Sequence, residues 1–257
     1  MNTALAILSH ALRMLIFDIY GTLRVLMPAL LLVLACAAGI ALFAPDMMTV
    51  LGAEPDVMLA PEPASALIFM VLGMTGLLGY AMMAILWHRH VLLNGAERAE
   101  VMRPGPGVFF SYIWRAMVVG MVQLLASVPI AVVVTLLAGP APGGLMGALT
   151  GLLGSLVFIW LALRFSICLP AAAIGAALPL RDSWQATASV SGPLWALALL
   201  FSGLNTIFFL LTGILMPGAN VVSIVGQTAI YLIEGLLFIS VLTTLYGHLM
   251  EGRSLGQ

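Results

Sequence analysis

Six long apolar stretches alternate with short polar connections along this chain of 257 residues. A helix needs about 20 mostly apolar residues to cross the hydrocarbon core of a bilayer, and each stretch has roughly that length. Because backbone polar groups in lipid must be satisfied within the protein, such stretches predict helices. We therefore expect an all-α, polytopic membrane protein with a single membrane domain over 1–257. Its six spans are predicted near 25–44, 66–87, 116–138, 145–165, 194–216 and 221–246.

The residues before the first span, 1–24, have a different pattern. Leucines such as Leu8, Leu12 and Leu15 recur at three- and four-residue spacing, while His10 and Arg13 fall on another face. This periodicity predicts a separate amphipathic helix over 3–23. Such a helix either lies in the cytoplasmic interface with its apolar side down or packs on the other helices, and the sequence favours neither.

The basic residues all lie on one side of the six spans. All nine are arginines, and the three connections on the opposite side carry none. The longest of those, 45–65, instead contains four acidic residues. Because basic residues near short loops mark the cytoplasmic side, both termini are predicted to be cytoplasmic. The arginines are Arg13, Arg24, Arg89, Arg98, Arg103, Arg115, Arg164, Arg181 and Arg253.

Composition excludes several classes of protein. The chain is 63% hydrophobic and 7% charged, whereas about a quarter of the residues in a soluble domain are charged. The net charge is −1 and the arginines are spread over several connections, which argues against nucleic-acid binding. Membrane lipid is the expected surrounding. The two cysteines, Cys36 and Cys168, fall in separate segments and are too few for a disulfide framework.

Glu234 is the only acidic residue within the predicted hydrocarbon depth. An ionised carboxylate there costs roughly 2.5–3.5 kcal/mol, so its side chain should face protein or water or be protonated. Gln227 and Tyr231 share its helical face, and Asn205 lies at a similar depth in the fifth span. These four residues form a candidate polar site for a proton or cation. The simpler interpretation, a hydrogen bond that joins two helices, is favoured because no second acid is present.

Small residues recur every four positions in the fourth span. A run of this kind leaves a groove in which another helix backbone can approach closely. The partner helix can belong to this chain or to another subunit, and the pattern does not distinguish the two. The run comprises Gly143, Gly147, Gly151 and Ser155.

Aromatic and basic residues gather at the cytoplasmic ends of the second and third spans. Tryptophan at headgroup depth and cations on phosphates predict interfacial anchoring. Two histidines two residues apart on a helix point to different faces, so no metal site is expected. The predicted anchors are Trp87, His88, Arg89, His90, Trp114 and Arg115.

Nothing in the sequence singles out a catalytic site. No Gly-x-Ser-x-Gly motif or phosphate-binding glycine loop is present, so we expect neither an enzyme nor a cofactor. An enzyme acting on lipid headgroups through His88, His90 or His248 is the least favoured hypothesis.

Four segments together resemble a known group of membrane proteins. They are 87–93 (WHRHVLL), 164–173 (RFSICLPAAA), 183–187 (SWQAT) and 242–248 (LTTLYGH). They resemble an uncharacterised family of six-span alphaproteobacterial inner-membrane proteins. More distantly, they are similar to the YciC-like group and to the membrane domain attached to some glycerophosphodiester phosphodiesterases. The resemblance implies a fold and a location in the bacterial inner membrane, and it implies no catalytic residues.

The leading functional hypothesis is therefore a non-catalytic one. We expect an accessory, assembly or scaffolding subunit that associates with another integral membrane protein, with a second copy of itself or with lipid. The alternative is a transporter for a small solute, a proton or a lipid that uses Glu234 and Asn205. Pro129, in the third span, is the best candidate for the helix break that many carriers contain.

Overall fold

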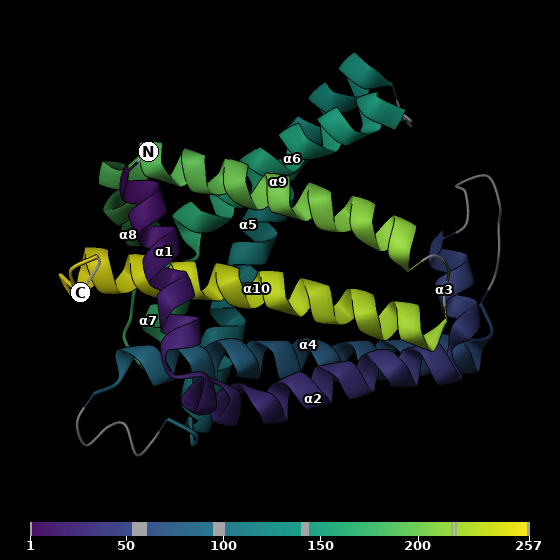
Figure 1. Cartoon of the computed structure of the whole chain (residues 1–257), viewed down its shortest axis with the longest axis horizontal. Helices are drawn as coiled ribbons and strands as arrows, with labels where there is room; N and C mark the ends of the chain where they lie inside the picture. The colour runs from purple at the N-terminus through teal and green to yellow at the C-terminus, as the bar shows by residue number, and fades with distance from the viewer. Residues whose placement is uncertain are drawn as a thin grey trace.

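The computed structural model describes residues 2–52, 61–94, 101–139, 144–216, 218 and 220–255, and every regular element among them is helical (Figure 1). The long helices are α2 (Ile19–Phe43), α4 (Pro63–Leu92), α5 (Pro106–Ala138), α6 (Gly144–Phe165), α9 (Ser191–Leu215) and α10 (Val221–Met250). The short elements are α1 (Asn2–Phe17), α3 (Pro45–Gly52), α7 (Cys168–Ala173), α8 (Leu180–Ala186) and the 3₁₀ helix η2 (Thr187–Val190). The predicted all-α class is confirmed.

Five helical segments among the described residues are long and apolar enough to cross a membrane. They are Ile19–Phe43, Pro63–Leu92, Pro106–Leu136, Leu180–Leu215 and Val221–Met250. The chain is thus a multi-pass, all-helical membrane protein. The apolar stretch of α6 is shorter, Leu149–Phe165, so the fourth of the six predicted spans stays a prediction.

The predicted amphipathic helix over 3–23 is wrong in its extent. Helix α1 ends at Phe17. The side chain of Asp18 accepts a hydrogen bond from the backbone N–H of Gly21 at 3.0 Å and caps the N-terminus of α2. Residues 19–24 therefore belong to the first span. The helix that remains, α1, buries Ile7 and Ala11 against the bundle, where it contacts α9 and α10. Its other face exposes Leu12 and Ile16, so both faces of α1 carry apolar side chains, and its place in the cytoplasmic interface stays a prediction.

Helices α2 and α4 lie side by side as an antiparallel hairpin (Figure 1). A Cβ added to Gly76 would lie 3.5 Å from Cβ of Cys36, and one at Gly79 would lie 3.2 Å from Leu32 and Val33. These glycines therefore let the two helix backbones approach closely.

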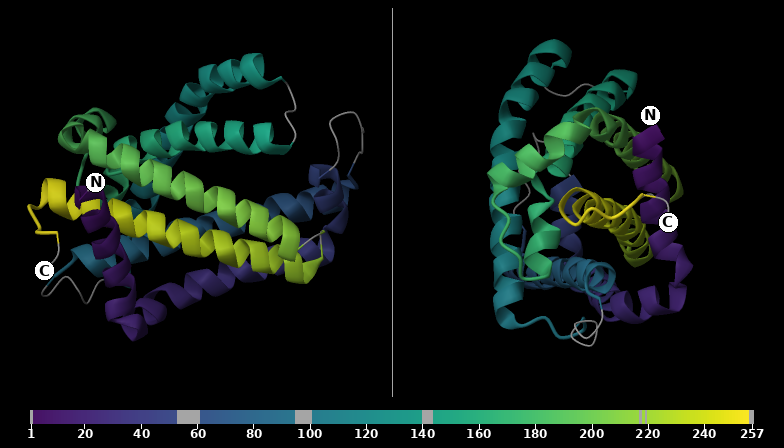
Figure 2. Two further views of the ribbon diagram at one scale, coloured as in Figure 1. Left: turned by 45° about the horizontal axis from the view of Figure 1, so that its top comes forward. Right: turned by 90° about the vertical axis from the view of Figure 1, so that its left-hand side faces the viewer.

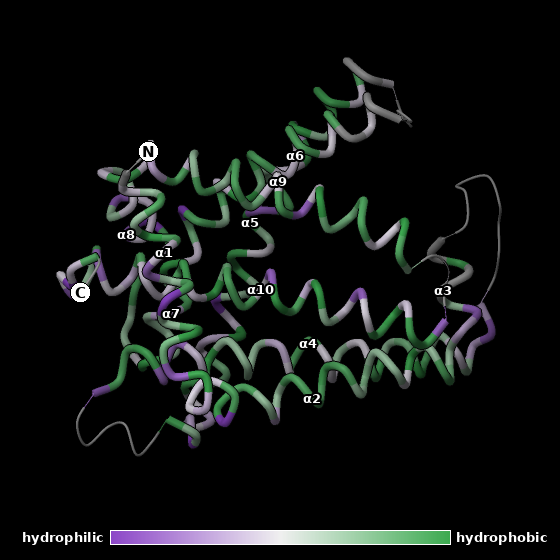
Figure 3. The backbone as a smooth tube through the Cα atoms, viewed as in Figure 1, coloured by the Kyte–Doolittle hydropathy of each residue, from purple (hydrophilic) through white to green (hydrophobic). Residues whose placement is uncertain are grey.

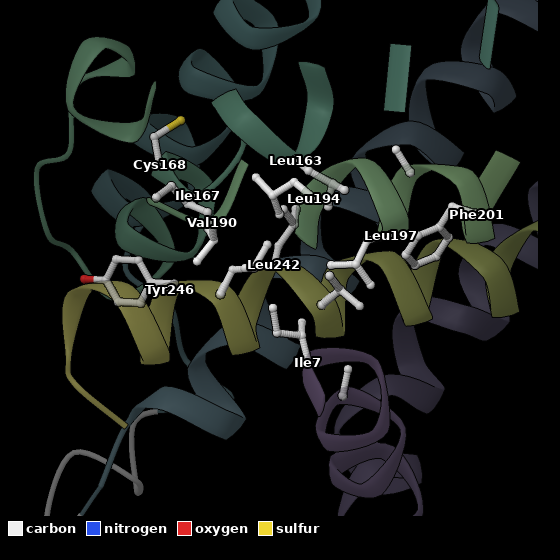
Figure 4. Packing of buried hydrophobic residues seen from close by; sticks show 14 of the residues in the cluster. Ile7, Leu163, Ile167, Cys168, Val190, Leu194, Leu197, Phe201, Leu242 and Tyr246 are labelled. Carbon is white, nitrogen blue, oxygen red and sulfur yellow. The ribbon is translucent and has the colours of Figure 1, made fainter. Parts of the chain in front are cut away.

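The buried side chains form two clusters. One cluster joins α1, α6, α9 and α10 around Leu163, Leu194 and Leu242 (Figure 4). The second joins α2, α4 and α10 around Met83 and Trp87. Most of the length of α2 is coloured hydrophobic in Figure 3, although many of its side chains face outward. Lipid is the solvent that such an exterior requires.

The α5–α6 hairpin projects from the rest of the bundle at the end where α5 finishes and α6 begins (Figure 2, left). Only 11% of the residues in the most apolar 18-residue stretch of α5 are buried, against 28–44% in the corresponding stretches of the other four candidate spans. The helix is continuous through Pro129, so the expected break is absent. Membrane helices tolerate such prolines when nearby groups satisfy the freed carbonyl.

Candidate functional site

The structure brings Glu234 and Asn205 together. Nδ2 of Asn205 on α9 donates a hydrogen bond to Oε2 of Glu234 on α10 at 3.3 Å, and both residues are half-buried. This is the contact between adjacent helices that their depths predict. Its length is slightly beyond the usual range, which is typical of a weak hydrogen bond.

No hydrogen bond among the described residues joins Gln227 or Tyr231 to that pair. Nε2 of Gln227 donates to the carbonyl of Met216 at 3.1 Å. Both residues line a cavity of about 410 Å³ with Phe209 and Gly213, near the end of α9 and the start of α10, and Glu234 is not among its described lining residues. The predicted four-residue site therefore contains a hydrogen-bonded pair and two residues that line a cavity, and a joint role for the four stays a prediction.

Tyr80 is a neighbour of Glu234 that the sequence analysis missed. A Cβ added to Gly235 would lie 2.5 Å from Oη of Tyr80, so the hydroxyl rests on the backbone beside Glu234. The Tyr80 hydroxyl of α4 thus contacts the residue that follows Glu234 on α10. The only available signal was a tyrosine inside a predicted span.

Three predicted interfacial anchors are internal instead. Trp87 and His88 are 0% exposed and Arg89 is 6% exposed, so the anchoring interpretation is wrong for them. Nη1 of Arg89 donates to the carbonyl of Ala173 at 3.0 Å, which joins α4 to α7. The physical reason is that the last carbonyls of a helix lack partners within the helix, so a buried one needs a donor and the guanidinium supplies it.

His88 also joins α4 to α10. Its Nδ1 lies 2.8 Å from Oγ1 of Thr243, whose own hydroxyl donates to the carbonyl of Ile239 at 2.8 Å. Because a hydroxyl has one proton, this arrangement places the imidazole proton on Nδ1. The other ring nitrogen, Nε2, is buried without a hydrogen-bond partner among the described residues.

The other predicted anchors are closer to the expectation. Trp114 is 66% exposed, and Nη1 of Arg115 donates to Oγ of Ser111 at 2.6 Å. His90 packs on Trp87, with 5.9 Å between the ring centroids. Whether Trp114 and Arg115 contact headgroups stays a prediction.

The predicted helix-packing groove has an internal end and an open end. Ser155 hydrogen-bonds Ser202 of α9, which also donates to the carbonyl of Leu152 at 2.8 Å. A Cβ added to Gly151 would meet nothing within 4 Å. Gly147 is half-buried, and Gly143 lies outside the described residues.

A second groove lies between α5 and α6. It has a volume of about 320 Å³, and its lining includes several small side chains from both helices. A Cβ added to Gly154 would again meet nothing within 4 Å. We call this the hairpin groove; it is lined by Ser127, Ala131, Thr150, Gly154, Ser155 and Phe158.

Arg164 is the centre of an aromatic cluster that the sequence analysis did not identify. Its guanidinium carbon lies 3.8 Å from the ring centroid of Trp184, and Nη2 donates to the Trp184 carbonyl at 2.7 Å. Ser183 donates back to the Arg164 carbonyl at 2.8 Å. Two of the segments that carry the family resemblance, 164–173 and 183–187, therefore meet in an internal structural contact.

The described residues contain no group of three or more His, Cys, Asp or Glu side chains that could hold a metal ion. Cys36 and Cys168 are both buried and free. Burial raises the pKa of the Cys168 thiol to about 11 although Arg115 opposes the shift, so the thiol is protonated and a poor nucleophile.

No family model, curated protein or solved structure matches this chain. The family resemblance of the four segments therefore stays an expectation.

Proposed function

We propose that this chain is a non-catalytic accessory, assembly or scaffolding subunit that binds a transmembrane helix of another integral membrane protein at its α5–α6 hairpin. The observation that carries the proposal is the poor coverage of α5, in which only 11% of the residues in the most apolar 18-residue stretch are buried. A helix that buries so little of its length in its own bundle is available for contact with a partner.

The hairpin groove supports a helix as the occupant. Helices associate in lipid through close van der Waals contact and interhelical hydrogen bonds, because lipid tails are as apolar as the side chains. Gly154 and Ala131 let a backbone approach. The hydroxyls of Ser127 and Thr150 donate their protons to carbonyls of their own helices, so they present oxygen lone pairs to the groove. A flexible acyl chain gains less from such a surface than a rigid helix does.

The proposal includes six spans in the bacterial inner membrane, with both termini cytoplasmic. Its support is the one-sided distribution of the nine arginines. Single cysteines at Glu62 and Arg103, in a chain without Cys36 and Cys168, test it with a membrane-impermeant maleimide on spheroplasts. Glu62→Cys should react directly, and Arg103→Cys should react only after the membrane is opened. The reverse pattern contradicts the orientation.

Co-purification tests the partner. The tagged full-length protein is extracted from its native membrane in mild detergent, and the associated proteins are identified by mass spectrometry. Gly154→Leu fills the hairpin groove, and because no atom of the described residues apart from the local helix backbone lies within 4 Å of the added Cβ, the fold should be retained. Gly73→Leu on α4 is the matched control, since its added Cβ is equally unobstructed.

We expect a stoichiometric membrane partner with the wild type and with Gly73→Leu, and its loss with Gly154→Leu. Equal recovery from both variants contradicts the hairpin as the binding surface. A lone monomer contradicts the subunit function, and a homo-oligomer sensitive to Gly154→Leu identifies the partner as a second copy of the chain.

The second candidate function is transport, and the Asn205–Glu234 hydrogen bond favours it. A half-buried carboxyl that accepts from an amide, with the Tyr80 hydroxyl against the next residue, Gly235, supports a proton or cation site. Reconstitution in vesicles with Glu234→Gln tests it. Normal folding with lost transport supports the carrier, poor folding indicates a structural hydrogen bond, and unchanged folding and transport exclude both roles.

A further inference from the structure

A cavity of about 470 Å³ is lined by residues of α1, of the end of α4 and of the segment that follows α10. Its lining brings together His10 and Arg13 from α1, His90 from α4 and Arg253 from the end of the chain. A small neighbouring cavity shares His10 and Arg253 and adds His248. Basic side chains from three separate elements thus converge on one space.

Arg253 is held rigidly in this lining. The backbone turns back after α10 at Gly252, which has a φ of 68°, and the N–H of Arg253 donates to the Gly247 carbonyl at 2.9 Å. The guanidinium donates to the carbonyls of Val91 and Leu92 at 3.0 and 2.9 Å. With Nε on Glu251, three of its five N–H groups are used, and two remain for other acceptors.

The two carboxylates near the cavity already have partners. Asp18 caps α2 through the N–H of Gly21, and Oε2 of Glu251 lies 2.6 Å from Nε of Arg253. Arg13 is exposed and charged. His10 has a buried Nδ1 with no hydrogen-bond partner among the described residues. The cavity therefore offers an anion the exposed guanidinium of Arg13 and the two remaining N–H groups of Arg253, while Asp18 and Glu251 are each held by another partner.

One side of the cavity is apolar. Met14, Phe17 and Val91 belong to its lining, together with the carboxylate-bearing Asp18, and Phe17 is 88% exposed. Tyr20, three residues further along the chain, is also 87% exposed. A basic floor beside exposed aromatic side chains is typical of a site at headgroup depth, where one part of a ligand is anionic and another is apolar.

We propose that this cavity is a phosphate-binding site, for the phosphate of an anionic phospholipid headgroup or for a soluble phosphate. The planar guanidinium groups of Arg13 and Arg253 suit paired phosphate oxygens, and His10 adds a ring nitrogen. This inference does not depend on a protein partner at α5–α6, because the cavity lies on other elements.

Native mass spectrometry of the full-length protein tests the lipid, with phosphatidylglycerol and phosphatidylcholine as the two probes. Calorimetric titration with inorganic phosphate tests the soluble source. Arg13→Gln removes one exposed cation from the cavity, and Arg103→Gln removes one exposed cation elsewhere on the same predicted side. Arg13→Lys keeps the charge and loses the planar geometry.

We expect the wild type to prefer phosphatidylglycerol, and Arg13→Gln to weaken its binding by about tenfold, as the loss of a charge-assisted hydrogen bond predicts. Arg103→Gln should bind like the wild type, and Arg13→Lys should be intermediate. The same pattern with inorganic phosphate would make the source soluble. Equal binding by wild type and Arg13→Gln, or equal losses in Arg13→Gln and Arg103→Gln, overturns the site. If Arg13→Gln fails to fold, the comparison of Arg13→Lys with Arg103→Gln decides in the same way.

Discussion

Nη1 of Arg253 donates a hydrogen bond to the carbonyl oxygen of Val91 at 3.0 Å, across 162 positions of sequence. The last carbonyls of a helix have no partner within the helix, and a cation beside them complements the helix dipole. The end of the chain therefore caps α4. Hydrophobic periodicity does not encode this contact, because it depends on where two distant helix ends meet.

Replacing Arg253 with alanine should lower the free energy of unfolding by about 1–3 kcal/mol, since the Val91 carbonyl loses its arginine donor and the Leu92 carbonyl keeps only the Asn94 side chain, at 3.3 Å. Thermal unfolding of the purified protein in mild detergent measures the change. Arg181→Ala, at an exposed position, should have little effect. Equal stability of the two variants would show that the cap contributes nothing.

The His88–Thr243 contact predicts a second stability effect. Thr243→Val keeps the shape of the side chain but leaves Nδ1–H of His88 buried without an acceptor, which should cost about 1–3 kcal/mol of unfolding free energy. Thr243→Ser keeps the hydroxyl and should lose less. A valine variant as stable as the serine variant would contradict the hydrogen bond.

Both cysteines should resist alkylation in the folded protein. Cys36 is 5% exposed, and Cys168 is 0% exposed, with its pKa raised to about 11 by burial. Iodoacetamide at pH 8 should therefore modify neither thiol until a denaturant is added, as mass spectrometry of the intact chain would show. Rapid modification of Cys168 in the native protein is inconsistent with its buried position at the start of α7.

Stability should fall at mildly acidic pH because of His10. Burial first, and then the charge of Arg13, lowers its pKa below the ordinary value of 6.5. The native state thus binds fewer protons than the unfolded state, so this contribution is complete above pH 6.5 and is lost as the pH falls below it. His10→Gln should flatten the melting temperature over that range, and an unchanged pH profile would assign the effect to other groups.

The helices could be predicted from sequence because the thickness of a bilayer imposes a length on each apolar stretch. All six predicted spans coincide with long helices. The apolar stretch of α6, Leu149–Phe165, is shorter than the five candidate membrane spans. The boundary at Asp18 was missed, since leucine spacing continues across it while a single side-chain cap decides where α2 begins.

The sites were harder to predict for a different physical reason. The depths of Asn205 and Glu234 could be estimated from helix length, so their contact was accessible. Arginine and tryptophan at a helix end can hydrogen-bond either a lipid headgroup or an internal carbonyl. Arg89 donates to an internal carbonyl, that of Ala173. The convergence of Arg13 and Arg253 depends on tertiary packing alone.

Photo-cross-linking in the native membrane is the most direct test of whether a partner helix binds at the α5–α6 hairpin. A photoreactive residue at Ala131, in the hairpin groove, is compared with one at Leu77 on α4, which is 60% exposed. The proposed function predicts a defined protein adduct from Ala131 and only lipid adducts from Leu77. Lipid adducts alone from both positions would contradict a partner helix at the α5–α6 hairpin.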